Sequence, residues 1–179
     1  MPRKNVVLPP PTVLDPLHRE LAMGIHAIWA SALYASGADV FAPPHRLDEE
    51  PDPFAAVTHM TGTFLLHDGA PQVGPIDAIV LTELRTDEDG WRCRARILEP
   101  DGSEIVLPAR PHRKLSAPLD LMTATLHALT ATLELEMPPD FGWRQLLGAN
   151  TIAGGLRSLR AQGREALRHA DDDAPPLLH

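Results

Sequence analysis

Cysteine is almost missing from this sequence, because Cys93 is the only one among 179 residues. A single thiol can form neither a disulfide within the chain nor a multi-cysteine zinc site, and such sparse use of cysteine is typical of a reducing compartment. No apolar run approaches the roughly 20 residues of a membrane span, and the first residues lack the apolar core of a signal peptide. We therefore expect a cytoplasmic protein with no membrane partner.

Positive charge is also scarce, since 16 Lys and Arg residues stand against 24 Asp and Glu, for a formal net charge of −8. Nucleic-acid binders gain affinity from cations that neutralise phosphates, so this balance argues against a nucleic-acid partner. Apolar residues nevertheless make up 44% of the chain and charged residues 22%, close to the globular average. The length is sufficient for one domain with a substantial core.

Sequence motifs for catalysis or cofactor binding are missing as well. The nine histidines include no pair at i, i+4 and no His-Glu-x-x-His element. No glycine-rich loop lies between a predicted strand and a helix, and the Gly-x-Ser-x-Gly elbow is absent. Cys93 falls on the apolar face of a predicted strand, where cysteine behaves as a small buried hydrophobe. We expect no cofactor, no metal and no catalytic residue with a local signature.

The pattern of apolar residues predicts a mixed α/β fold. Around residues 91–98, apolar side chains alternate with three arginines, as in a half-buried antiparallel strand. Acidic-Gly turns on both sides predict a three-stranded meander over about residues 77–108. Further strands are expected at 4–8, 39–41 and 60–66, a short helix at 54–57, and long helices at 16–36, from Ser116 to the prolines at 138–139, and at 149–170.

These elements predict one mixed sheet of five to six strands, with two long helices packed on it and a C-terminal helix. The expected organisation is an α/β domain over residues 1–148, the helix over 149–170 and a disordered tail over 171–179. Asp15 is expected to cap the first long helix and Ser116 the second. Phe141 and the apolar residues after it are expected to fold back on the core.

The C-terminal helix has a thin apolar stripe beside a row of arginines. Such a helix needs a neighbour to cover the stripe, either this domain, a twin chain or a following helix. Docking to a partner and packing within the chain are both open interpretations. The residues expected to form an interaction surface are Leu156, Leu159, Leu167, Arg157, Arg160 and Arg164.

The three arginines of the central strand, Arg92, Arg94 and Arg96, lie on one face and form a possible anion-binding site. The alternative is a solvated face on which these arginines pair with Glu83 and Glu104 of the neighbouring strands. The feature that separates the two is whether the arginines line a concavity or a flat, exposed sheet.

The order of elements resembles the TolB N-terminal-like or FlgO-like module. The matching stretches are 6–9 with the helix from Asp15, then 38–43, 57–69 and 94–106 with the helix from Ser116. The resemblance implies an anticodon-binding-like α/β fold, related to the CsgG-like lipoprotein domains and often placed before tetratricopeptide repeats. It also implies a bacterial interaction or assembly module with no catalytic residues. The chain departs from the pattern in its proline-rich first connection and its single trailing helix, so it is either free-standing or a fragment.

The sequence therefore favours a non-enzymatic protein-interaction or assembly module, with a protein partner or a homo-oligomer. The alternative is a sensor domain for a small anionic, nucleotide-like ligand on the arginine face. A third interpretation is an enzyme whose site is assembled from scattered His and Asp residues, because such a site leaves no local signature.

Overall fold

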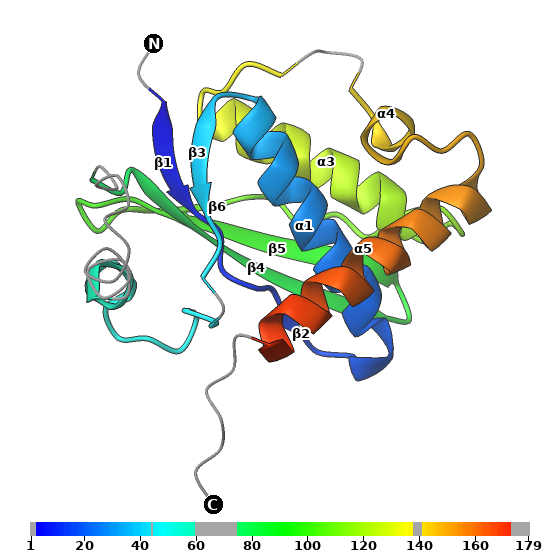
Figure 1. Cartoon of the computed structure of the whole chain (residues 1–179), viewed down its shortest axis with the longest axis horizontal. Coiled ribbons are helices and arrows are strands. Elements are labelled where there is room, and N and C mark those ends of the chain that lie inside the picture. Colours follow the sequence, from blue (N-terminus) through cyan, green and yellow to red (C-terminus); the bar gives the residue numbers. More distant parts are fainter. Residues whose placement is uncertain (1–2, 44, 60–74, 138–140, 173–179) are drawn as a thin grey trace, which may run out of the picture.

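One mixed sheet runs through the middle of the protein and carries helices on one face (Figure 1). The computed structural model describes residues 3–43, 45–59, 75–137 and 141–172. The strands are β1 (Lys4–Val7), β2 (Thr12–Val13), β3 (Ala38–Phe41), β4 (Ala78–Asp87), β5 (Gly90–Leu98) and β6 (Glu104–Val106). Their order is β3-β1-β4-β5-β6, with β2 also paired to β4. The predicted mixed sheet of five to six strands is confirmed.

The antiparallel part of the sheet is the meander that the sequence predicts. β4 and β5 pair along their whole lengths, from Ile79 opposite Leu98 to Asp87 opposite Gly90. Gly90 has a positive φ of 107°, a conformation that glycine adopts without strain. β6 pairs with only the last three residues of β5. The central hairpin is therefore long, and its outer neighbour is short.

The parallel part of the sheet is interrupted by prolines. β1 runs parallel to β3 and to the start of β4, and β2 runs parallel to β4 five residues further on, at Glu83 and Leu84. Between β1 and β2 lie three consecutive prolines, which carry no N–H to donate to a ladder. The chain therefore leaves β4 after Val7 and returns to it at Thr12.

The helices are η1 (Pro16–His18), α1 (Arg19–Ala35), α3 (Ala117–Thr132), α4 (Trp143–Leu147) and α5 (Ile152–Asp172), with residues 53–59 also helical. The predicted cap at Asp15 is confirmed, because its carboxylate accepts a hydrogen bond of 3.0 Å from the Leu17 N–H. Ser116 stands at the N-cap of α3 but makes no capping bond. Its hydroxyl donates instead to Asp120 at 2.6 Å, which corrects the prediction for that cap.

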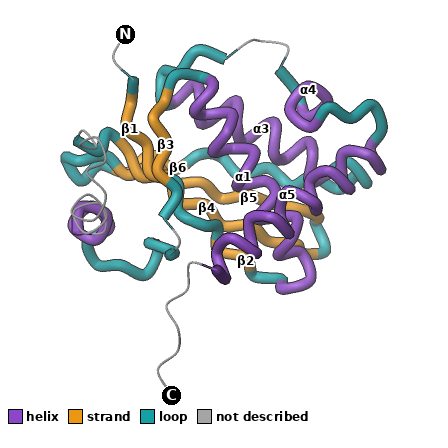
Figure 2. The backbone as a smooth tube through the Cα atoms, viewed as in Figure 1, coloured by secondary structure: helices purple, strands orange, loops and turns teal. Residues whose placement is uncertain are grey.

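α1 and α3 cover one face of the sheet, and α5 crosses over α1 on the outer side (Figure 2). Trp29 of α1 is fully buried, and its indole N–H donates to the carbonyl of Met122 in α3 at 2.9 Å. α4 packs its Trp143 beside Gly155 of α5. The two predicted long helices on the sheet, the C-terminal helix and the short apolar segment are thus present.

α1 and α5 approach each other so closely that their backbones touch. A Cβ atom built at Gly24 would overlap the carbonyl oxygen of Leu159, and one at Gly163 would overlap that of Glu20. Only glycine allows two helix backbones to approach so closely. These two glycines therefore fix where α5 lies on α1.

The opposite face of the sheet is only partly covered. A small apolar cluster of Val7, Leu47, Val57, Ile79 and Leu81 lies there, under the segment that includes residues 45–59. Further along β4 and β5 the same face is charged. The strand expected at 60–66 lies outside the described residues. The disordered tail was expected from residue 171, but α5 continues through Asp172, which corrects the start of that tail, and residues 173–179 lie outside the described part of the chain.

Candidate functional site

A break in pairing along the outer edge of β5 opens a pocket. At one end of the break, the Leu107 N–H donates to the Ala95 carbonyl at 2.9 Å. At the other end, Trp91 and His112 exchange two backbone hydrogen bonds of 2.8 and 2.9 Å. The intervening residues 108–111 read Pro-Ala-Arg-Pro, and they outnumber by one the β5 residues that they face. Since proline cannot donate to the ladder, this segment bulges away from the strand.

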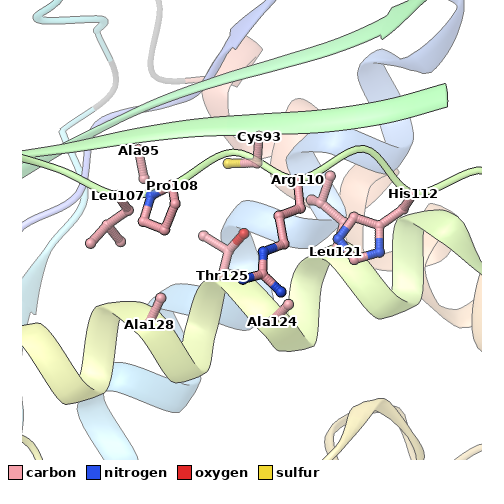
Figure 3. Close-up of a pocket in the computed structure, with 10 residues that line it drawn as sticks. All are labelled: Cys93, Ala95, Leu107, Pro108, Arg110, His112, Leu121, Ala124, Thr125 and Ala128. Carbon is pink, nitrogen blue, oxygen red and sulfur yellow. The ribbon is translucent and has the colours of Figure 1, made fainter. Parts of the chain in front are cut away.

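The helix beneath the bulge does not fill the space, because its facing side chains are small. α3 presents Ala124, Thr125 and Ala128 towards β5. The result is a cavity of about 330 Å³ between β5, α3 and the 107–112 segment (Figure 3). We call it the Cys93 pocket, and its lining residues are Cys93, Ala95, Leu107, Pro108, Arg110, His112, Leu121, Ala124, Thr125 and Ala128.

Polar and apolar groups are separated along the Cys93 pocket. Arg110 extends from the bulge towards α3 and places its guanidinium beside Ala124 and Thr125, with His112 on the same side (Figure 3). Leu107 and Ala128 lie at the other end. The pocket therefore has one cationic end and one apolar end.

Arg110 has no carboxylate partner among the residues that the structure describes. Its neighbour Arg113, by contrast, pairs with Asp89 at the tip of the β4–β5 hairpin. A guanidinium offers five N–H donors in a planar fork that suits a carboxylate or a phosphate. Arg110 is thus available for an anion from outside the chain.

Cys93 forms part of the pocket wall rather than a reactive group. It is buried, as the sequence predicts, and burial raises the pKa of its thiol to about 12, although a hydrogen bond with Thr125 acts in the opposite direction. The thiolate is the nucleophilic form of cysteine. At neutral pH Cys93 is therefore a neutral, weakly polar contact surface.

The three arginines predicted as a possible anion site face the other side of β5. Arg94 and Arg96 line a concavity of about 240 Å³, so this face is not flat, but Asp48 and Glu83 line it too. Arg96 pairs with Glu104 at 3.6 Å, as the alternative interpretation predicts. Two carboxylates line this concavity with the two arginines, although Asp48 is paired with Arg46 at 2.6 Å, so an anion bound there would meet charges of both signs.

Arg92 is also neutralised. It pairs with Asp89 at 2.6 Å and with Asp87 at 3.4 Å. Glu83 lies directly opposite Arg94 in the β4–β5 register, although the described residues give Arg94 no ion pair within 4 Å. In the arginine row, Arg92 and Arg96 are therefore paired with carboxylates and Arg94, within the described ranges, is not. Arg110, which also has no ion pair among the described residues, lies on the helix-covered face.

The apolar stripe of α5 is used within the chain. Leu159 is fully buried in the main core, and Leu156 packs against it half-buried. Leu167 is also half-buried. Of the two interpretations open for this helix, packing within the chain is what the structure shows for Leu159.

The arginines of α5 lie on its outer surface. Arg164 pairs with Glu20 of α1 at 3.3 Å, whereas Arg157 and Arg160 are exposed and have no ion pair within the described part of the chain. The candidate interaction surface is therefore reduced to these two arginines and the small residues around them.

The histidines that the structure describes are dispersed. His26 is buried with its Nε2 atom 2.9 Å from the Leu8 carbonyl oxygen, His127 contacts the Phe141 carbonyl, and the His18 ring packs against Trp91. Within the described ranges, no three His, Cys, Asp or Glu side chains gather as metal ligands would. No helix there is both long and apolar enough to cross a membrane.

Comparisons with known proteins give the Cys93 pocket no precedent: no family model, no curated protein and no solved structure matches the chain. The resemblance to the TolB N-terminal-like module therefore stays a prediction.

Sequence reasoning missed Arg110, His112 and the small face of α3. Two signals could have found them. The first is a pair of prolines flanking Ala109-Arg110 directly after a short strand, and the second is alanine at positions 124 and 128, one helical turn apart.

Proposed function

We propose that this chain is a binding domain that takes a small organic anion into the Cys93 pocket. The observation that carries the proposal is the guanidinium of Arg110, which has no ion pair within the described part of the chain and lies at the end of an otherwise largely apolar cavity. Ligand sites are typically apolar concavities with a few polar groups that fix orientation. The sequence suggested the same kind of function as an alternative, but with the ligand on the arginine row. The proposed site lies on the opposite face of β5.

The size and lining of the pocket narrow the ligand. A volume of about 330 Å³ lies at the lower end of the roughly 300–1,000 Å³ typical of ligand sites. No Phe, Tyr or Trp is among its lining residues, so no large aromatic ring is available to stack a nucleotide base. A compact carboxylate suits the pocket better than a nucleotide. The single cysteine supports a cytoplasmic location, and the net charge argues against nucleic acid.

A second candidate is the interaction or assembly module implied by the TolB N-terminal-like, bacterial resemblance. The observation in its favour is the exposed pair Arg157 and Arg160 on α5, which have no ion pair in the described ranges. Since the leucine stripe beside them is largely covered by α1, a protein partner or a second copy would have to be acidic and bind the outer surface of α5.

The test is an NMR titration of the ¹⁵N-labelled full chain with phenylacetate, a small amphipathic carboxylate. We expect saturable shifts in the amides of Cys93, Ala95 and residues 107–128. Arg110→Gln should weaken binding about tenfold, because hydrogen bonds to charged groups contribute about 1.5–3 kcal/mol.

The matched control is Arg157→Gln, which removes an exposed arginine that has no ion pair in the described ranges and does not line the Cys93 pocket, and which should leave phenylacetate binding unchanged. The absence of saturable shifts around the pocket, with phenylacetate and with small straight-chain carboxylates alike, would refute the proposal. Native mass spectrometry of the same sample tests the second candidate, because an oligomer that Arg157→Gln/Arg160→Gln dissociates would support assembly through α5.

A further inference from the structure

The extent of the Cys93 pocket along α3 limits which anions fit it, in addition to its charge. Its α3 wall runs from Leu121 to Ala128, eight residues whose Cα atoms span about 10 Å along a helix axis. The lining of the pocket therefore extends about 10 Å along α3. Its cationic group, Arg110, lies at one end, with His112 on the same side (Figure 3).

From this arrangement we infer that the ligand is an unbranched aliphatic carboxylate of medium length, bound with its carboxylate at Arg110 and His112 and its chain directed towards Leu107 and Ala128. The inference rests on the proposed function, because it specifies the ligand class of the same pocket. Carbon–carbon bonds of about 1.5 Å advance an extended chain by about 1.25 Å each, so octanoate, with seven such bonds, spans about 9 Å.

The wall contacts match such a chain better than a ring or a branched group. Ala124 and Ala128 lie one helical turn apart on α3, and their small side chains leave room along this wall of the pocket. Ala95 and Cys93 on β5 and Leu107 at the far end complete an apolar lining without carboxylates. Pro108 and the aliphatic stem of Arg110 can cover the chain from the bulge side.

The carboxylate has defined donors at its end of the pocket. Arg110 can donate two parallel N–H bonds, and the imidazole of His112 can donate a third. Thr125 lies beside the guanidinium (Figure 3). A neutral alcohol of the same length would leave the guanidinium without its anionic acceptor, so the carboxylate should bind more tightly than the alcohol.

The first experiment is calorimetry of the full-length chain with butanoate, hexanoate, octanoate and decanoate, with octanol as the neutral comparison. Each added methylene contributes about 0.8 kcal/mol when buried. Affinity should therefore rise about fourfold per methylene up to octanoate and then level off. Octanoate should bind at least tenfold more tightly than octanol, and Arg110→Gln should abolish that difference while Arg110→Lys restores part of it.

The second experiment determines the direction of the chain by intermolecular NOEs in the octanoate complex. We expect contacts from the terminal methyl group to Ala128 and Leu107, and from the methylene next to the carboxylate to Arg110 and His112. Ala128→Leu should weaken octanoate binding strongly, because it fills the apolar end. Ala131→Leu, an exposed alanine on the same helix, should not.

The outcomes separate this inference from the proposed function. Phenylacetate binding in the pocket, together with octanoate affinity no greater than that of butanoate, would overturn the inference and leave the proposed function intact. Equal affinity for octanol and octanoate, or reversed NOEs, would also overturn it. If neither phenylacetate nor any chain acid shifts the pocket amides, both proposals fail.

Discussion

The two faces of the sheet are stabilised in different ways. On the helix-covered face, Trp29 and the leucines of α3 are fully buried, and the backbones of α1 and α5 touch. On the opposite face, beyond a small apolar cluster, the side chains of β4 and β5 are mainly charged groups in partly exposed ion pairs such as Arg96–Glu104. Buried apolar contacts contribute far more than exposed ion pairs. We therefore expect stability to depend mainly on the helix-covered face.

The largest expected effect comes from the α1–α5 contact. Gly163→Ala places a methyl group on the Glu20 carbonyl. The α5 backbone fixes the position of this methyl group and the α1 backbone fixes that of the carbonyl, so α5 must move away. We expect the free energy of unfolding to fall by about 3 kcal/mol, the upper part of the range for overpacking. Urea denaturation of the full chain measures this fall in the free energy of unfolding.

Gly154→Ala is the matched control for this prediction. It lies in the same helix, and its added methyl group would meet two side-chain atoms and no backbone, the Thr151 hydroxyl at 3.0 Å and the Ala149 Cβ at 3.8 Å. Alanine is the better helix former by about 1 kcal/mol, so this variant should be neutral or slightly stabilised. Equal free energies of unfolding for Gly163→Ala and Gly154→Ala would show that the close approach of α1 and α5 contributes nothing to stability.

A smaller effect should come from His26, also on the helix-covered face. Burial lowers the pKa of His26, although hydrogen bonds with the Leu8 and Pro9 carbonyls partly oppose the shift. Below about pH 6.5 the unfolded chain binds a proton at this position while the folded chain does not. Stability should therefore fall as the pH drops from about 6.5 towards the folded-state pKa, by at most about 1.4 kcal/mol per pH unit.

His26→Gln tests this prediction, because glutamine can still donate to the Leu8 carbonyl but does not titrate. Its stability should change less with pH between about 6.5 and 5 than that of the natural chain, as measured by urea denaturation at each pH. His169→Gln is the control, since His169 is exposed on α5. If the stability of the natural chain and that of His26→Gln depend on pH in the same way, the pH dependence does not come from His26.

The sequence predicted the elements whose signals are local. The alternation of Trp91, Cys93, Ala95 and Ile97 defined β5 and the face that it buries, and the acidic-Gly turns defined the hairpin. The position of α5 depends on contact between Gly24 and Gly163, which are far apart in the chain. A glycine in a helical pattern shows no partner, so both docking and internal packing remained open.

The candidate pocket escaped sequence reasoning for a different reason. Pattern analysis detects side chains that fill space, whereas the Cys93 pocket exists because Ala124 and Ala128 fill too little. The three strand arginines form a pattern that the sequence shows, because they recur at every second residue and so share one face of the strand. The isolated Arg110 has no such pattern, and only the structure shows that Arg92 and Arg96 pair with carboxylates whereas Arg110 pairs with none in the described ranges.

The smallest effect is expected on the charged face. Arg96 and Glu104 are 3.6 Å apart, and their side chains are 31% and 38% exposed, so water and salt screen the pair. Arg96→Gln should change the free energy of unfolding by no more than about 0.5 kcal/mol, and a double-mutant cycle with Glu104→Gln measures the pair itself. A coupling above about 1 kcal/mol that persists in high salt would contradict the proposed difference between the faces. A coupling near zero would mean that this face can change its charges at little cost to folding, whereas the helix-covered face, which carries the Cys93 pocket, cannot change its packing as freely.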